Sequence, residues 1–258
     1  MDTPVWDLSR VTYGDLKGRR FDLAVLPWGA TEPHNYHLPF GTDVIETSRI
    51  AERACEMAWQ EGARLVCLPT IPFGTQTTQR AFPFAMNMNP TTQLAVLTDI
   101  CRTLESSSVP KLIILNGHGG NDFAWMIRQL YGTVNIFLAT VNWYQLGDQS
   151  IFADPGDHAG EMETSLCLHL VPELVAPLEQ ADEARVPRFV VEMFNTGKAK
   201  TSRPWHLLTR SSGVGNPRPA TAEKGKRFFD NVTRELAKFF VQLANAPMNE
   251  SFPFEKSP

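Results

Sequence analysis

Four side chains able to bind a metal ion lie close together near the amino terminus: Glu32, His34, His37 and Asp43. The surrounding residues 26–43 contain three prolines and two glycines, so this segment cannot form a regular helix. In extended backbone, side chains two residues apart lie on the same side, which would bring Glu32 and His34 together. Carboxylates combined with imidazoles suit zinc, manganese or iron. A metal site is one interpretation, and ordinary surface or core residues are the other.

A second candidate motif is the sequence Asn-Gly-His-Gly-Gly-Asn at residues 116–121. Its three glycines surround one imidazole, that of His118, and glycine lets the backbone approach a ligand closely. The motif is typical of a tight turn, of an oxyanion-binding loop or of a metal-binding loop. These residues alone do not distinguish the three.

A third motif, residues 157–163, contains His158, Glu161 and Glu163 at the expected start of a helix. His158 and Glu161 are three residues apart, a spacing that places two side chains on one helical face. Carboxylates in the first turn also stabilise a helix through its dipole. We therefore expect one of the two glutamates to have only that structural role.

Strands and helices alternate along the chain, and they must position the three motifs. Short apolar runs predict buried strands at residues 21–26, 64–68, 111–115 and 135–141. Apolar residues at helical spacing predict helices at 43–62, 91–104, 157–170 and 220–243, and a helical stretch that ends near residue 130. This order predicts an α/β fold with a mainly parallel sheet and helices on both faces. The motifs follow strands, so they should meet at the carboxyl edge of the sheet.

Two long segments lack this alternation. Residues 70–90 are rich in Thr, Gln, Phe and Met, and a loop of this length is often functional. A substrate lid or a subunit contact is the functional interpretation, and an ordinary covering loop is the alternative. Residues 171–220 are expected to be irregular.

The composition narrows the classes of function. The 258 residues fit a single domain spanning 1–258, because no linker separates two parts. The net charge of -4 points to neither nucleic acid nor a membrane surface as a partner. Residues 1–6 lack the basic start and the apolar core of a signal peptide. The four separated cysteines are typical of buried thiols in a reducing cytoplasm, and disulfides are the less favoured alternative.

Taken together, the motifs resemble the creatininase family of metal-dependent amidohydrolases. Residues 26–43 are similar to the family's signature around Thr-Glu-x-His, residues 116–121 to its Asn-Gly-His-Gly-Gly-Asn variant, and residues 158–161 to its His-Ala-Gly-Glu helix start. Residues 212–217 resemble its carboxyl-terminal segment. The resemblance spans residues 20–225 and depends on the order of the motifs, because each alone has little specificity.

This resemblance implies a compact three-layer α/β/α domain with two divalent metal ions, zinc and/or manganese with iron as a further option, on the loops that follow the strands. Glu32 and His118 would bind one ion, His34 would bind the other, and Asp43 would bridge them. Two ions that share a carboxylate can hold a hydroxide and polarise a carbonyl, which suits hydrolysis of an unreactive C–N bond.

The resemblance also implies two catalytic positions. His158 corresponds to a histidine that carries a proton to the leaving nitrogen, and Trp143 to a tryptophan that contacts the substrate. Two positions depart from creatininase itself: Gly120 stands in place of a glutamate ligand, and Asp154 in place of a second tryptophan over the substrate. We expect Glu161 to supply the missing carboxylate, and creatinine is not specified as the substrate.

The sequence therefore predicts a binuclear metal-dependent hydrolase of a non-peptide C–N bond in a small cyclic amide, formamide or related molecule. One alternative is a catalytically inactive protein of the same fold that binds a ligand or serves as a structural subunit. Another is an enzyme with one metal ion, because Gly120 removes a ligand. The resemblance also implies a homo-oligomer, such as a hexamer. The expected partner is a small-molecule amide, with no nucleic acid and no membrane.

Overall fold

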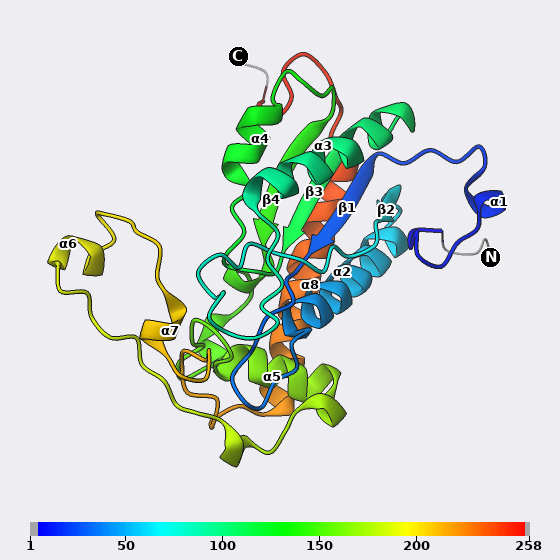
Figure 1. The fold of residues 1–258 in the computed structure, drawn as a ribbon. Coiled ribbons are helices and arrows are strands. Elements are labelled where there is room, and N and C mark those ends of the chain that lie inside the picture. The colour runs from blue at the N-terminus through cyan, green and yellow to red at the C-terminus, as the bar shows by residue number, and fades with distance from the viewer. Residues whose placement is uncertain (1–4, 256–258) are drawn as a thin grey trace.

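A four-stranded parallel sheet forms the centre of the molecule, which is described here from a computed structural model covering residues 5–255 (Figure 1). The expectation that the chain has no signal peptide was based on residues 1–6, which lie partly outside the described residues. The strand order is β2-β1-β3-β4, and every neighbouring pair is parallel. The strands are β1 Leu23–Trp28, β2 Leu65–Cys67, β3 Lys111–Asn116 and β4 Phe137–Asn142. The predicted α/β fold with a parallel sheet is confirmed.

The central strand β1 continues through a proline, where the sequence predicted its end. Val25 and Pro27 both direct their carbonyl oxygens to one side of the strand, toward the backbone N–H groups of Leu68 and Ile71. The partner strand β2 ends at Cys67. The N–H that proline lacks therefore falls beyond the end of β2, where the ladder needs no donor from it.

Helices cover both faces of the sheet and build two apolar cores, as the alternation of side chains along each strand requires. On one face, Leu23, Val25 and Ile113 pack against helices α2 Thr42–Gln60, α5 Glu161–Leu170 and α8 Ala222–Asn245. On the other face, Leu26 and Ile114 pack against α3 Pro90–Ser106 and α4 Ala124–Leu130. Figure 1 shows α2, α5 and α8 grouped on one side, with α3 and α4 on the other.

The remaining elements are short. They are α1 Tyr13–Leu16, α6 Glu192–Asn195, α7 Trp205–Leu208 and the 3-10 helices η1 Trp143–Gln145, η2 Gln149–Ile151, η3 Pro172–Leu174 and η4 Leu178–Gln180. The prediction of a largely irregular segment at residues 171–220 agrees with this arrangement. The predicted start of the helix at residues 157–170 is wrong: α5 begins at Glu161, so residues 157–160 form a loop and His158 does not share a helical face with Glu161.

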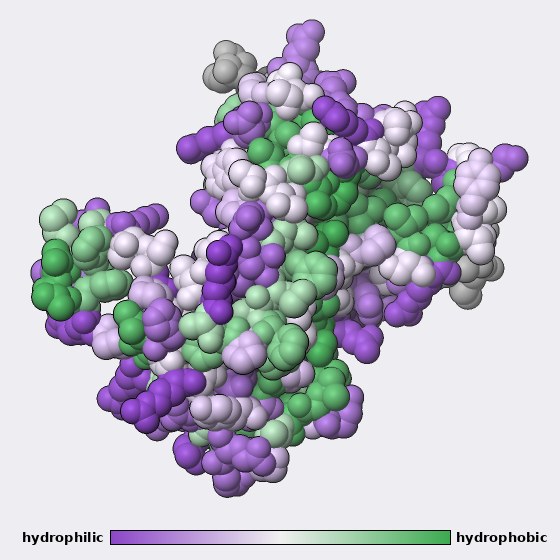
Figure 2. All heavy atoms as spheres, in the orientation of Figure 1, coloured by the Kyte–Doolittle hydropathy of each residue, from purple (hydrophilic) through white to green (hydrophobic). Residues whose placement is uncertain are grey.

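Two apolar surfaces stand out on the face shown in Figure 2. The segment around α6 projects from the body of the molecule as an arm, and Val190, Val191 and Met193 on it are exposed. An apolar groove lies between the amino-terminal segment and α3, lined by Leu16, Ile100 and other residues. All four cysteines are buried and free. No helix within residues 5–255 combines the length and the apolar character that crossing a bilayer requires.

Candidate metal centre

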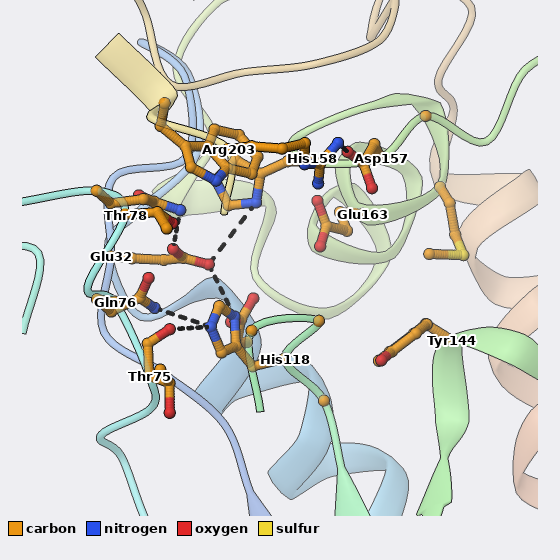
Figure 3. Close-up of a pocket in the computed structure, with 18 of the residues that line it drawn as sticks. Glu32, Thr75, Gln76, Thr78, His118, Tyr144, Asp157, His158, Glu163 and Arg203 are labelled. Carbon is orange, nitrogen blue, oxygen red and sulfur yellow. Dashed lines mark hydrogen bonds and ion pairs between the residues drawn. The ribbon is translucent and has the colours of Figure 1, made fainter. Parts of the chain in front are cut away.

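Three loops meet at the carboxyl edge of the sheet and bring a first group of ligands together. Glu32 follows β1, Asp43 lies in the first turn of α2, and His118 follows β3. Nδ1 of His118 lies 3.0 Å from Oε1 of Glu32 and 3.0 Å from Oδ2 of Asp43. All three side chains are buried, and their ligand atoms are close enough together to surround one ion. Figure 3 shows His118 directed toward Glu32.

A second group of ligands shares the carboxylate of Asp43. Nε2 of His34 lies 2.9 Å from Oδ1 of Asp43 and 4.0 Å from Oε1 of Glu163. These three residues also offer atoms close enough to hold one ion. The two oxygens of Asp43 thus face different groups, Oδ2 toward His118 and Oδ1 toward His34. A single carboxylate in this position can bridge two cations.

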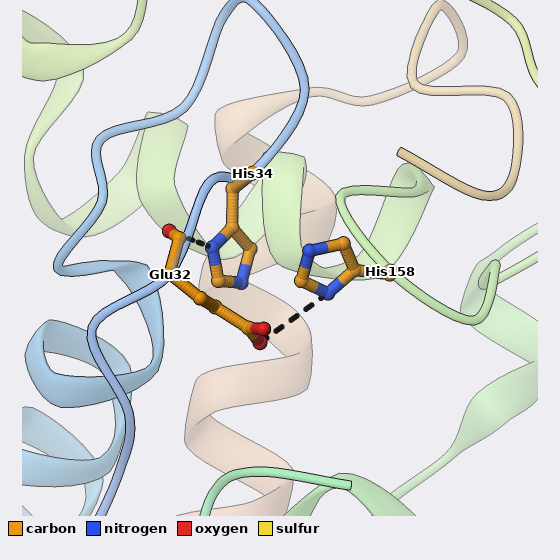
Figure 4. A group of neighbouring side chains, drawn as sticks. All are labelled: Glu32, His34 and His158. Atoms are coloured by element: carbon orange, nitrogen blue, oxygen red, sulfur yellow. Dashed lines mark hydrogen bonds and ion pairs between the residues drawn. The ribbon is translucent and has the colours of Figure 1, made fainter. Parts of the chain in front are cut away.

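His158 lies against both groups from the loop that precedes α5 (Figure 4). Its Nδ1 is 3.7 Å from Oε1 of Glu32, and its ring centroid is 4.1 Å from that of His34. Glu32, His34 and His158 form a third set of atoms close enough for an ion. The ring of Trp205 packs on the imidazole of His158 edge-on, with centroids 5.0 Å apart.

Backbone carbonyl groups orient all three imidazoles in the same way. Nδ1 of His34 lies 3.0 Å from the carbonyl oxygen of Glu32, Nε2 of His118 lies 3.2 Å from that of Thr75, and Nε2 of His158 lies 2.9 Å from that of Pro33. A carbonyl can only accept, so the neutral forms of His34 and His158 carry their proton on the nitrogen that faces it, whereas Nε2 of His118 also lies 3.2 Å from the side-chain amide nitrogen of Gln76. The lone pair on the other nitrogen then points at the carboxylates, as a metal ligand requires.

The carboxylate ligands also have outer partners. Gln79 donates a hydrogen bond from its side-chain amide to Oε2 of Glu32, and the backbone N–H of Ala159 donates to Oε2 of Glu163. Oε1 of Glu32 and Oδ2 of Asp43 are buried, and both lie 3.0 Å from Nδ1 of His118, which can donate to them only when the ring is protonated. Two buried anionic oxygens that share one ring nitrogen fit the donor set of a divalent cation, which would replace that proton.

The buried carboxylates of the site favour positive charge beside them. Burial disfavours a charged imidazolium, but the neighbouring Asp43 carboxylate outweighs it and raises the pKa of His34 to about 10. For His118, burial is likewise outweighed, here by Glu32 and Asp43, so its pKa is raised well above 6.5. Burial also acts to raise the pKa of Asp43, yet the two histidines hold it below 3.8. Cations here stabilise the carboxylates, and a divalent ion with neutral imidazoles meets the same need.

The structure places Glu161, which was predicted to be a ligand, apart from the three candidate ligand groups. Its carboxylate lies outside all three ligand groups and pairs with the ammonium group of Lys224. It also accepts hydrogen bonds from the backbone N–H groups of Ala153 and Asp154, at 2.9 and 3.2 Å. Glu161 therefore anchors the loop before α5 to α8. Glu163, the other glutamate considered, occupies the position expected of a ligand because it lies half a turn further along the helix.

Trp143, which was predicted to contact the substrate, does not line the cavity among the described residues. Its side chain is buried in the core beneath the site, and its indole N–H donates to Oγ1 of Thr47 at 2.9 Å. The neighbouring Tyr144 lines the cavity instead. Burial raises the pKa of Tyr144 to about 12, so its hydroxyl is a neutral donor near pH 7.

Gly120 explains one departure from creatininase in structural terms. A Cβ atom at this position would collide with the His118 ring and with the carbonyl oxygen of Thr75. The loop therefore cannot carry a glutamate here without moving His118, and the carboxylate of the second group comes from α5 instead.

His37, which the sequence grouped with the candidate ligands, is not in any of the three groups, and its Nε2 lies 2.8 Å from Oγ1 of Thr164.

A cavity of about 360 Å3 opens over the ligands. Residues of the 70–90 loop line one wall, including Thr75, Gln76, Thr78 and Gln79, so this loop covers the candidate site. Arg203 and Trp205, from the irregular segment, line another wall (Figure 3). Neither residue was predicted from the sequence, where their only signal is an Arg and a Trp on either side of a Pro in a segment without periodicity.

Comparisons with known proteins agree with this geometry. A family model described as creatininase (creatinine amidohydrolase) matches residues 9–240. A crystal structure from Bacteroides fragilis, provisionally named a creatinine amidohydrolase, is 40% identical, with a TM-score of 0.88, over 95% of this chain and 99% of that chain. A solved manganese creatininase is 20% identical, with a TM-score of 0.76 over 94% of this chain and 100% of that chain, and shares the fold.

Two functionally named relatives differ in what they act on. The mycofactocin precursor peptide peptidase of Mycolicibacterium smegmatis is 26% identical over 221 residues, which is 83% of each chain. The creatinine amidohydrolase of Pseudomonas putida is 25% identical over 252 residues, covering 89% of this chain and 90% of the relative. The family match over most of the chain, together with the shared fold, confirms the resemblance, and the chain belongs to the creatininase family.

Proposed function

We propose that this creatininase-family hydrolase uses two divalent metal ions, zinc and/or manganese, to cleave a non-peptide C–N bond in a small cyclic amide, formamide or related molecule. The observation that carries the proposal is the position of Asp43, whose two carboxylate oxygens face two separate groups of buried ligands. Glu32 and His118 would complete one metal site, and His34 and Glu163 the other. Ions held there would polarise the amide carbonyl and lower the pKa of a water bound to them.

His158 supplies the proton transfer in this proposal. Its Nε2 faces the carbonyl oxygen of Pro33 at 2.9 Å, which fixes the ring and leaves Nδ1 directed at the cavity near Glu32. From that position Nδ1 can take a proton from the attacking water and deliver it to the leaving nitrogen. Trp205 packs edge-on against the ring and limits its rotation.

The size and lining of the cavity support the proposed substrate class. About 360 Å3 is near the lower end of the volumes typical of small-molecule sites, which favours a compact amide over an extended peptide. Creatinine is not favoured, because Asp154 stands where creatininase has a tryptophan over the substrate and Trp143 is buried away from the cavity. A short peptide is the competing substrate class, because one of the relatives is a peptidase.

The experiment is a hydrolysis assay on a panel of cyclic amides, formamides and dipeptides with the protein loaded with zinc or manganese. We expect release of amine from a member of the first two classes, loss of that activity with a chelator, and loss of more than about 100-fold with His158→Ala. Cleavage of only the dipeptides would contradict the substrate class. A chain that binds neither metal and hydrolyses nothing would instead support the alternative of an inactive protein that binds a ligand.

The remaining expectations concern assembly and location. We propose a homo-oligomer, supported by the exposed Val190, Val191 and Met193 on the projecting arm and by the apolar groove beside α3. Size-exclusion chromatography with light scattering tests it, and a monomer at micromolar concentration would contradict it. A cytoplasmic location is proposed on the four buried free thiols.

A further inference from the structure

One wall of the cavity carries an arginine that the proposed reaction does not use. Arg203 lines the cavity, and its guanidinium carbon lies 5.5 Å from the ring centroid of Trp205. Trp205 in turn packs on His158, so Arg203 is separated from the proton-transfer group by one aromatic ring. Figure 3 shows Arg203 on the side of the cavity where His158 and Asp157 also lie.

The guanidinium of Arg203 has unused capacity for binding. A guanidinium offers five N–H donors in a planar fork. Among residues 5–255, Arg203 donates one side-chain hydrogen bond, from Nη1 to Oδ2 of Asp157 at 2.8 Å. The guanidinium lies over the ring of Trp205, and its N–H groups other than the one paired with Asp157 are available to a planar anion.

The ion pair with Asp157 does not explain why an arginine stands at position 203. The two side chains are 37% and 48% exposed, and an ion pair this accessible to water contributes little to stability. Of the side chains lining the cavity within the described part of the chain, Arg203 is the only one with a permanent positive charge. Apart from the imidazole of His118, which is assigned to a metal ion, the other charged groups there are carboxylates, and Glu32, Asp43 and Glu163 among them are assigned to the metal ions as well. A second anion that enters the cavity would therefore meet Arg203.

We propose that Arg203 determines specificity by binding a carboxylate of the substrate, which is then an amide that also carries a carboxylate group. This inference rests on the proposed function and names the substrate class of the same site. The carboxylate displaces Asp157 from the fork and accepts two parallel N–H groups of Arg203. The C–N bond at the other end of the molecule then lies over Glu32 and Asp43, beside His158.

The test compares matched substrates that differ only in charge. N-formylglycine and N-formyl-β-alanine carry the carboxylate, and their carboxamides are neutral analogues of nearly the same shape. We expect the metal-loaded wild type to prefer the acids in kcat/KM. Arg203→Gln is expected to raise KM for the acids by about 10- to 100-fold, the range for losing a charge-assisted hydrogen-bond pair, and to change KM for the carboxamides by less than about threefold. Glycylglycine and its carboxamide form a second arm, which distinguishes a small acid from the carboxyl terminus of a short peptide.

Two further variants separate substrate binding from a structural role. Arg188→Gln is the matched control, because Arg188 is an exposed arginine of the same segment, pairs with Glu192 and does not line the cavity. Asp157→Asn removes the rival carboxylate and leaves Arg203 in place, so we expect a stronger preference for the acids. If the Arg203–Asp157 pair were only a structural link, both Arg203→Gln and Asp157→Asn would reduce turnover of acids and carboxamides alike.

The outcomes distinguish this inference from the function on which it rests. Hydrolysis of acids and carboxamides with equal KM, unchanged in Arg203→Gln, would overturn the role of Arg203 and leave the hydrolase intact. Hydrolysis of no member of either panel by metal-loaded wild type would overturn the proposed function for these amides, and the inference with it.

Discussion

Glutamine substitutions at Glu161 and Glu163 should have opposite effects on stability and on metal content. Glu161 is fully buried, pairs with Lys224 and accepts two backbone N–H groups, so it acts as an anchor. Glu163 lies beside His34 and Asp43, and burial together with the nearby Asp43 charge raises its pKa although His34 opposes this. We therefore expect Glu161→Gln to destabilise the protein without loss of metal, and Glu163→Gln to lose metal without destabilising the metal-free protein.

The size of the first effect follows from burial. Removing one partner of a fully buried ion pair costs about 3–5 kcal/mol. The Lys224 side chain is 27% exposed and can regain water, which reduces the cost to about 1–3 kcal/mol. For a domain of this size, 1 kcal/mol shifts the melting temperature by about 2–4 °C, so we expect Glu161→Gln to lower it by about 2–12 °C.

The assay combines differential scanning calorimetry of chelated protein with elemental analysis after reconstitution with manganese or zinc. Glu161→Gln should keep two ions per chain, and Glu163→Gln should fall toward one. The metal-free Glu163→Gln protein should melt at or above the wild-type temperature, because a crowded carboxylate has been neutralised. Loss of an ion from Glu161→Gln with full occupancy in Glu163→Gln would show that the two roles are assigned the wrong way round.

Three further predictions concern protons and packing. Metal binding at pH 8 should release up to two protons per chain. The pKa of His34 is raised to about 10 and that of His118 well above 6.5, so both rings stay protonated until they become ligands. Calorimetry in buffers of different ionisation enthalpy measures the proton release, and the absence of any release would contradict the prediction. Burial lowers the pKa of His37 from 6.5 to about 4, so the unfolded state binds more protons in that window and stability should fall by up to about 3 kcal/mol as the pH drops through it. In urea titrations, the stability of His37→Gln should fall less with decreasing pH than that of the wild type. An equal fall would show that His37 is not the source of the pH dependence. Gly120→Ala should displace the His118 ring and weaken metal binding by about 1–3 kcal/mol, and unchanged affinity in a metal titration would contradict the close packing of this loop.

The sheet was predictable because its strands are buried on both faces. The continuous apolar sequence of β3 and the alternation with helices led to the parallel sheet. The extension of β1 through Pro27 was not predictable, because it depends on where the neighbouring strand β2 ends. A proline tolerated at such a point leaves no local signal.

The candidate ligands of the first two motifs were predictable because each motif directly follows a strand. Glu32, His34, Asp43 and His118 meet as their positions after β1 and β3 require. The choice between Glu161 and Glu163 was not predictable, because it depends on the residue at which α5 begins and on a lysine from the distant helix α8.

Contacts between distant segments could not be predicted from the sequence either, because they depend on the tertiary structure. Trp143 was expected at the substrate, but a hydrogen bond to Thr47 of α2 holds its ring in the core. Arg203 and Trp205 reach the cavity from a segment without periodicity, and no local pattern places them there. Residue type and spacing therefore predicted most of the candidate metal ligands, whereas the cavity walls depend on tertiary structure.

The most direct test of the account is a crystal structure of the metal-loaded protein with anomalous data at the manganese and zinc edges. We predict two anomalous peaks per chain, one beside each carboxylate oxygen of Asp43, with Glu32 and His118 at the first and His34 and Glu163 at the second. A single peak, or none within coordination distance of Asp43, would contradict the shared-carboxylate centre.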